Sequence, residues 1–67
     1  MALRINGQEQ DMALETATLM DVVLARGLKP ERVVIEYNGS VVPREHWFTV
    51  NVVDNDIIEI VSFVGGG

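Results

Sequence analysis

Apolar and polar residues alternate over the first six positions, with Leu3 and Ile5 on one face, and this alternation predicts a half-buried strand. Asn6-Gly7 comes next and favours the positive φ angles of a type I′ turn. Residues 8–14 are therefore expected to return as the second strand of a hairpin, with Leu14 on its apolar face.

A short helix is predicted for residues 19–26. Thr18 is the expected N-cap, because Asp21 follows it at the spacing of a capping box. Gly27 and Pro30 end the segment. Its apolar positions recur at i, i+3 and i+4, as on the buried face of a helix: Leu19, Val22 and Val23.

Two further strands and a helical turn are expected in the middle of the chain. Residues 33–37 are mostly β-branched or aromatic and predict a strand, and Asn38-Gly39 predicts a tight turn before a partner strand at residues 40–42. Residues 44–47 lack strand alternation and are expected to form a short helical turn. An extended segment is expected to resume at residues 48–50.

The longest apolar run, residues 57–64, is interrupted only by Glu59 and Ser62 and follows a turn signal at residues 54–56. The run predicts a strand covered on both faces, which belongs inside a sheet. The order β-β-α-β-β is satisfied if this last strand lies beside the first and the helix covers one sheet face. We therefore predict an α+β protein with a mixed sheet of four to five strands packed on one short helix. Its expected core is Leu3, Ile5, Leu19, Val23, Ile35, Ile58 and Ile60.

Composition narrows the classes of function. The 67 residues fit one small domain, and the absence of cysteine excludes disulfides, cysteine-ligated zinc and cysteine nucleophiles. A single histidine makes a metal site unexpected. The net charge of −5 disfavours nucleic acid as a partner, because clustered basic residues supply affinity for phosphate backbones. No apolar run reaches the roughly 20 residues that span a bilayer, so we expect a cytoplasmic protein without membrane contact.

Few residues suggest catalysis. His46 has no nucleophile and orienting acid at a suggestive spacing, so a surface histidine is expected. Residues 54–56 are similar to the first ligands of a calcium loop, but the later ligand positions are not filled, and a plain turn is the better interpretation. Trp47 and Phe48 are interpreted as a small satellite core cluster.

Three glycines, residues 65–67, directly follow the longest apolar run. Composition alone favours a disordered end. The alternative is that the Gly67 carboxylate is itself reactive. Glycine lacks a Cβ and adopts extended and positive-φ conformations freely, so Gly65 and Gly66 would let the carboxylate thread a narrow enzyme channel.

Several short motifs also occur in a definite order along the chain. They are Met-x-Leu-x-Ile-Asn-Gly at residues 1–7, Thr18-Leu19, Gly27-Leu28-x-Pro30, Glu36-Tyr37-Asn38-Gly39, Val42-Pro43-Arg44-Glu45-His46-Trp47, and Asp54-x-Asp56 running through Ile58-Glu59-Ile60-Val61 to Phe63-Val64-Gly65-Gly66-Gly67. Together they resemble the ThiS family of ubiquitin-like sulfur carriers, which have the β-grasp fold. The Val-Pro-Arg-x-x-Trp segment favours this family over the molybdopterin-synthase carriers. Asn55 stands where the family often has glycine, although asparagine also tolerates left-handed turns.

The resemblance implies a β-grasp domain at residues 1–64 and a flexible tail at residues 65–67. It also implies a substrate protein, not an enzyme, with no bound cofactor. An E1-like adenylyltransferase would use ATP to activate Gly67, a sulfur donor would convert the carboxylate to a thiocarboxylate, and thiazole synthase would use that sulfur for the thiamin thiazole. Activation is required because a terminal carboxylate with a pKa of about 3.5 is ionised at pH 7 and is a poor electrophile.

Other functions stay open at this point. They are a carrier that serves molybdopterin, amino-acid or tRNA thiolation, a plain interaction module with an inert tail, and a conjugated ubiquitin-like tag. The partner-binding surface is expected beside the last strand, where Val61 and Phe63 face away from the predicted core, but burial of both under the Trp47 loop fits the sequence equally well. Residues 45–67 hold four acids and no Lys or Arg, so a partner with a basic rim is expected.

Overall fold

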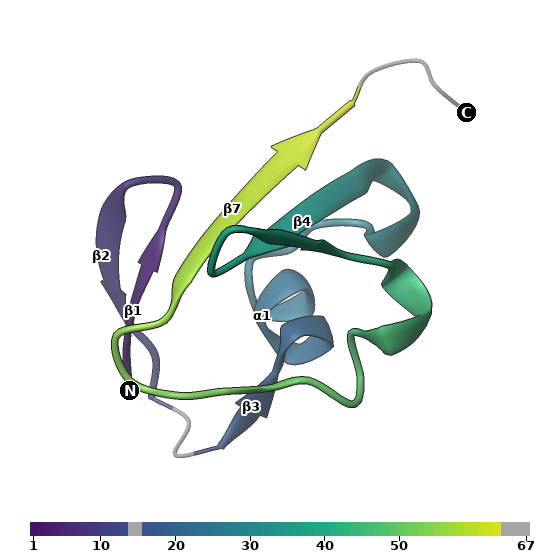
Figure 1. Cartoon of the computed structure of the whole chain (residues 1–67). Coiled ribbons are helices and arrows are strands. Elements are labelled where there is room, and N and C mark those ends of the chain that lie inside the picture. The colour runs from purple at the N-terminus through teal and green to yellow at the C-terminus, as the bar shows by residue number, and fades with distance from the viewer. Residues whose placement is uncertain (14–15, 64–67) are drawn as a thin grey trace.

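A computed structural model of the protein describes residues 1–13 and 16–63. These residues form short strands, one α-helix and two 3-10 turns (Figure 1). In chain order the elements are β1 (Ala2–Ile5), β2 (Gln8–Asp11), β3 (Ala17–Thr18), α1 (Leu19–Ala25), η1 (Pro30–Arg32), β4 (Val33–Tyr37), β5 (Ser40–Val42), η2 (Arg44–His46), β6 (Asn51–Val52) and β7 (Ile57–Ser62).

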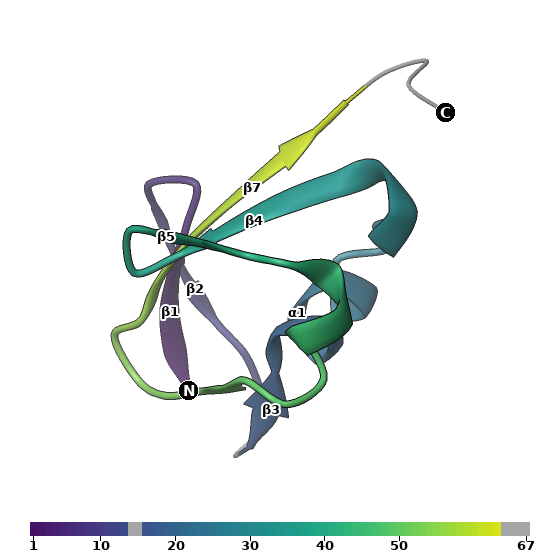
Figure 2. The same ribbon diagram turned by 45° about the vertical axis from the view of Figure 1, so that its right-hand side comes forward.

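The main sheet has five strands in the order β2-β1-β7-β4-β5, and α1 lies against one of its faces (Figures 1 and 2). β1 pairs with β7 in parallel, whereas the β1–β2, β4–β7 and β4–β5 pairs are antiparallel. The predicted α+β class and mixed sheet are therefore confirmed, with the last strand beside the first. The separate two-stranded sheet of β3 and β6 was not predicted.

The first hairpin closes at Asn6 and Gly7, whose φ angles of 52° and 79° suit the predicted tight turn. Its last hydrogen bond joins the Met12 amide to the Met1 carbonyl at 2.8 Å. β2 ends at Asp11, three residues before its predicted end, and residue 14 lies outside the described residues.

Helix α1 begins with the predicted capping box. The Asp21 amide donates to the Thr18 hydroxyl at 3.2 Å, and the Thr18 amide donates to the Asp21 carboxylate at 2.9 Å. The chain leaves the helix through Gly27, whose φ of +72° is unfavourable for residues with a Cβ. Local sequence signals thus define both ends of the helix.

All seven predicted core residues are buried between α1 and the sheet. Trp47 joins this main core with 1% exposure, and its indole Nε1 donates to the Val42 carbonyl at 2.8 Å. Phe48, by contrast, is 64% exposed, so the predicted satellite cluster of Trp47 and Phe48 is wrong. The turn after η2 directs the Trp47 ring into the core and leaves the Phe48 ring in solvent.

The predicted helical turn at residues 44–47 is confirmed as η2, but the extended segment at residues 48–50 is wrong. The Thr49 amide and hydroxyl both donate to the His46 carbonyl, at 3.0 Å and 2.9 Å. These bonds continue the turn, so the next strand begins only at Asn51.

Within residues 1–13 and 16–63, no helix is both long enough and apolar enough to cross a membrane.

Candidate functional site

Strand β7 leads toward the predicted reactive tail, and it lies in the middle of the main sheet. Its antiparallel pairing with β4 reaches Ser62, which lies opposite Val33. Beyond the strand, the Phe63 amide still donates to the Arg32 carbonyl at 3.0 Å. The position at which the chain leaves the sheet is therefore held by backbone hydrogen bonds, at the end of the molecule remote from the N-terminus (Figure 1). Residues Gly65, Gly66 and Gly67 lie outside the described residues.

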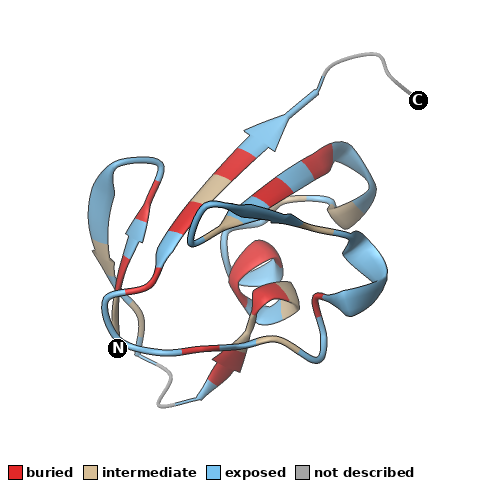
Figure 3. Ribbon diagram, viewed as in Figure 1, coloured by how far each residue is buried: buried red, intermediate tan, exposed pale blue. Residues whose placement is uncertain are grey.

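Burial alternates along β7, as Figure 3 shows. Ile58 and Ile60 face the core and are 0% and 7% exposed, whereas Ile57, Val61 and Phe63 are 48%, 62% and 40% exposed. The prediction of a strand covered on both faces is therefore wrong. The helix covers one face of the sheet, and no element among the described residues covers the other (Figure 2).

The exposure of Val61 and Phe63 also decides between the two interpretations left open by the sequence. Trp47 lies in the core on the helix side of the sheet and so does not cover them. Burial under the Trp47 loop is contradicted, and both side chains are available to a partner.

We call the uncovered side of the main sheet the outer face. Neighbouring strands add exposed apolar side chains to it, since Val34 of β4 pairs with Val61, and Val41 of β5 pairs with Glu36. Val34 is 44% exposed and Val41 is 64% exposed. The outer face consists of Ala2, Arg4, Glu9, Asp11, Val34, Glu36, Val41, Ile57, Glu59 and Val61, with Phe63 next to them. An apolar surface across three neighbouring strands is typical of an interaction site.

The start of β7 is fixed by the buried carboxylate of Asp56, which is 8% exposed. It accepts hydrogen bonds from the Tyr37 hydroxyl at 2.6 Å, the Val53 amide at 2.8 Å and the Asn38 side-chain amide at 3.2 Å. Asn38 also accepts from the Ile57 amide at 2.8 Å. The carboxylate thus joins the β4–β5 turn to the loop before β7.

This network shifts two ionisations. Burial acts to raise the pKa of Asp56, but the hydrogen bonds from Tyr37, the Val53 amide and Asn38 outweigh it and lower the pKa from its ordinary 3.8. Burial and the adjacent carboxylate raise the pKa of Tyr37 from 10.0 to about 12. Asp56 therefore stays ionised at neutral pH and serves as a hydrogen-bond acceptor.

The other candidates from the sequence have the expected structural roles. His46 lies exposed in η2, and residues 54–56 form a turn in which Asn55 takes a left-handed φ of 73°. Across residues 1–13 and 16–63, no three His, Asp or Glu side chains are grouped so that they could hold a metal ion.

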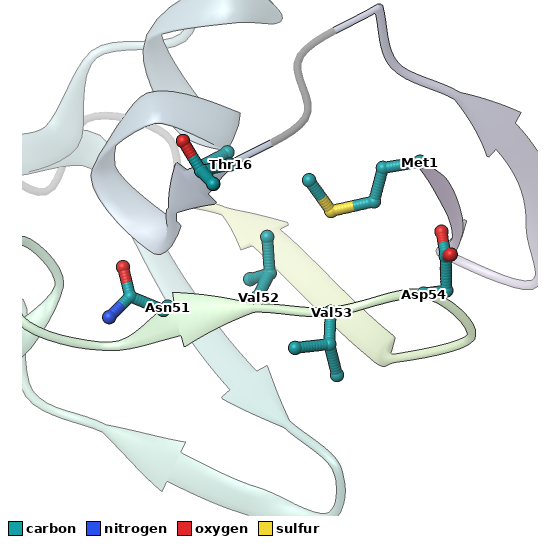
Figure 4. Close-up of a pocket in the computed structure, with 7 residues that line it drawn as sticks. Met1, Thr16, Asn51, Val52, Val53 and Asp54 are labelled. Atoms are coloured by element: carbon teal, nitrogen blue, oxygen red, sulfur yellow. The ribbon is translucent and has the colours of Figure 1, made fainter.

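A pocket of about 510 Å³ lies beside β3 and β6 (Figure 4). The side chains of Met1 and Val52 point into it, whereas Val53 points away. Its polar groups come from Thr16, Asn51 and Asp54, and one Asp54 oxygen already accepts from the Ala2 amide at 2.9 Å. The described lining therefore contains no nucleophile paired with a base, and the pocket lies at the opposite end of the fold from Phe63.

Comparison with known proteins covers the whole length of this fold. A family model described as the ThiS family matches residues 3–67. The sulfur carrier protein ThiS of Bacillus subtilis is 35% identical over 65 residues, which are 97% of this chain and 98% of that protein. A crystal structure of the thiamine biosynthesis protein ThiS from Geobacter metallireducens superimposes with a TM-score of 0.86 at 32% identity and covers all of both chains.

The chain belongs to the ThiS family. The resemblance found in the sequence motifs, the β-grasp fold and the assignment as a sulfur carrier of thiamine biosynthesis are thereby confirmed. A ThiS-family protein is a substrate of other enzymes and not itself an enzyme. A thiazole synthase of Magnetococcus marinus is also similar, at 36% identity over 67 residues, but this chain spans only 20% of that longer protein.

Part of the outer face and the role of Asp56 were not predicted from the sequence. The sequence predicts strands at Val34 and Val41 but does not predict which sheet face their side chains occupy. For Val34 the signal was present, because the period-2 alternation places it on the opposite face from the buried Val33 and Ile35. No local signal distinguished Asp56, because its two side-chain hydrogen-bond donors lie 19 and 18 residues earlier in the chain.

Proposed function

We propose that this ThiS-family protein carries sulfur as a thiocarboxylate on Gly67, in the cytoplasm. An E1-like adenylyltransferase activates the carboxylate with ATP, and thiazole synthase receives the sulfur. Residues 1–64 act as the folded carrier and residues 65–67 as the tail that enters partner active sites. The observation that carries the proposal is the family match, which runs to residue 67 and so includes all three glycines.

The proposed chemistry balances without a catalytic group on this chain. A Gly67 carboxylate oxygen attacks the α-phosphorus of ATP, and pyrophosphate leaves. The acyl-adenylate then loses AMP when a donor of sulfide-level sulfur attacks the carbonyl carbon. The product is a thiocarboxylate, in which one oxygen has been exchanged for sulfur. Thiazole synthase as the recipient is supported by the similarity of this chain to a fifth of one such enzyme.

The outer face is the proposed docking surface, with Val61 and Phe63 as contacts. Both side chains are exposed, and Phe63 lies two residues before Gly65 in the sequence. A partner that covers these side chains would hold the chain where it leaves β7, so that residues 65–67 enter the active site. Docking and threading are then two separable requirements.

Threading can be tested with Gly66→Val. Without a Cβ at residue 66 the tail fits a narrow channel, so a β-branched side chain should abolish adenylation through a clash with the partner. We expect adenylyltransferase-dependent ATP–pyrophosphate exchange with the wild type and none with the variant, at an equal thermal midpoint. An extra residue after Gly67 should be equally inactivating. Normal exchange by a chain lacking residues 66 and 67 would contradict the proposal.

Docking can be tested with Phe63→Asp and a matched control, Phe48→Asp. Both phenylalanines are exposed, at 40% and 64%, but Phe48 lies in the turn after η2 and not on the outer face. We expect Phe63→Asp to abolish binding to the adenylyltransferase, while Phe48→Asp binds like the wild type and both remain folded by circular dichroism. Equal binding by the two variants would remove Phe63 from the docking surface.

A further inference from the structure

Two glutamates lie side by side on the outer face. Glu36 of β4 and Glu59 of β7 are direct antiparallel partners, so both side chains leave the sheet on the same side. Directly opposed residues have Cβ atoms about 4.5–5.5 Å apart, and like charges at that spacing are destabilising. The fold therefore places an unfavourable pair of carboxylates on the central strand β7 and its neighbour β4.

Nothing in the described part of the chain neutralises this pair. The ion pair found within residues 1–13 and 16–63 joins the Met1 amino group to Asp11 at 3.4 Å. Arg4, the basic residue of the outer face, instead donates to the Gly7 carbonyl at 3.3 Å. The chain has twice as many acids as bases, 10 against 5. The two glutamates are thus left for a cation from outside.

The surroundings of the pair indicate what kind of cation fits. Val34 of β4 and Val61 of β7 pair with each other, two residues along their strands from the glutamates. Val41 of β5 pairs with Glu36, and Ile57 lies two residues before Glu59 on β7. All four are exposed, by 44–64%. A partner that covers these side chains also removes water from the glutamates, and a carboxylate pair without water must either take up a proton or bind a cation.

We propose that Glu36 and Glu59 together receive one arginine of a partner protein that covers the outer face. A planar guanidinium has five N–H donors and is weakly hydrated, so it can bond both carboxylates at once within an apolar surround, whereas an ammonium is compact and strongly hydrated. This inference rests on the proposed function, and it assigns the contact to the adenylyltransferase that activates the tail.

The test compares Glu36→Gln, Glu59→Gln and the double variant with Glu45→Gln, which removes the same charge from η2, outside the sheet. Dissociation constants for the adenylyltransferase would be measured by calorimetry at two salt concentrations. Each outer-face variant should bind about tenfold more weakly or worse, since a charge-assisted hydrogen bond is lost, and the double variant should lose less than the product of the singles. Glu45→Gln should bind like the wild type.

A second readout separates this contact from a structural role. Replacing either glutamate removes repulsion in the free protein, so both variants should keep or raise their urea midpoint while their binding falls. Wild-type affinity in the double variant, or an equal loss in Glu45→Gln, would overturn the inference and leave the proposed function intact. A wild-type chain that neither binds the enzyme nor is adenylated would overturn the proposed function, and this inference with it.

Discussion

Strand β7 offers one substitution at two adjacent positions on opposite faces of the sheet. Ile57→Val and Ile58→Val each delete one methylene and keep a β-branched side chain, so strand propensity stays the same. Ile58 is fully buried in the core, whereas Ile57 is 48% exposed on the outer face. The two variants therefore differ only in the environment of the lost atom.

The magnitude follows from that burial. A buried methylene contributes about 0.8 kcal/mol of transfer free energy, and the cavity it leaves brings the usual cost of Ile→Val to about 0.5–1.5 kcal/mol. Ile58→Val should thus destabilise the protein by about 1 kcal/mol. Ile57→Val should change the free energy of unfolding by less than about 0.5 kcal/mol, as is usual for a surface substitution.

Urea denaturation followed by circular dichroism measures both values. With an m-value of about 1 kcal/mol per molar urea for a small domain, Ile58→Val should lower the midpoint by about 1 M. Ile57→Val should leave the midpoint nearly unchanged. Equal midpoints for the two variants, or a larger loss at residue 57, would refute the assignment of the two faces of β7.

Three other predictions concern stability. Ile60→Ala should cost about 2–5 kcal/mol and largely unfold a domain of this size, and an unchanged thermal midpoint would place Ile60 outside the core. The pKa of Asp56 is lower in the folded protein than its unfolded value of 3.8, so the ionised carboxylate stabilises the protein above pH 3.8. This stability is lost as pH falls through the folded pKa. Asp56→Asn should therefore flatten the acid side of a curve of unfolding free energy against pH. The raised pKa of Tyr37 acts in the opposite direction: its contribution is complete below pH 10 and is lost as pH rises through about 12, a loss that should be absent in Tyr37→Phe.

Much of the fold could be predicted because its signals are local. Asn6-Gly7 and Asn38-Gly39 both turn with positive φ angles, and Thr18 with Asp21 caps the helix as expected. Strands β3 and β6 could not be predicted, since two residues are too few to show alternation.

The functional surface was harder to predict because hydrophobicity alone does not distinguish a core from an interface. Val61 and Ile60 give the same apolar signal, yet one is 62% exposed and the other 7%. Only the topology, with α1 on one side of the sheet, separates them. The pairing of Glu36 with Glu59 likewise depends on the register between two strands that are far apart in sequence.

The most direct test of a thiocarboxylate on Gly67 is intact-protein mass spectrometry after reaction with the adenylyltransferase, ATP and a sulfur donor. Proteolysis would then locate the change within the chain. We expect one oxygen to be exchanged for sulfur in the C-terminal fragment, and we expect the exchange to need ATP. Sulfur found in any other fragment, or an unmodified chain under conditions in which the adenylyltransferase is active, would contradict this expectation.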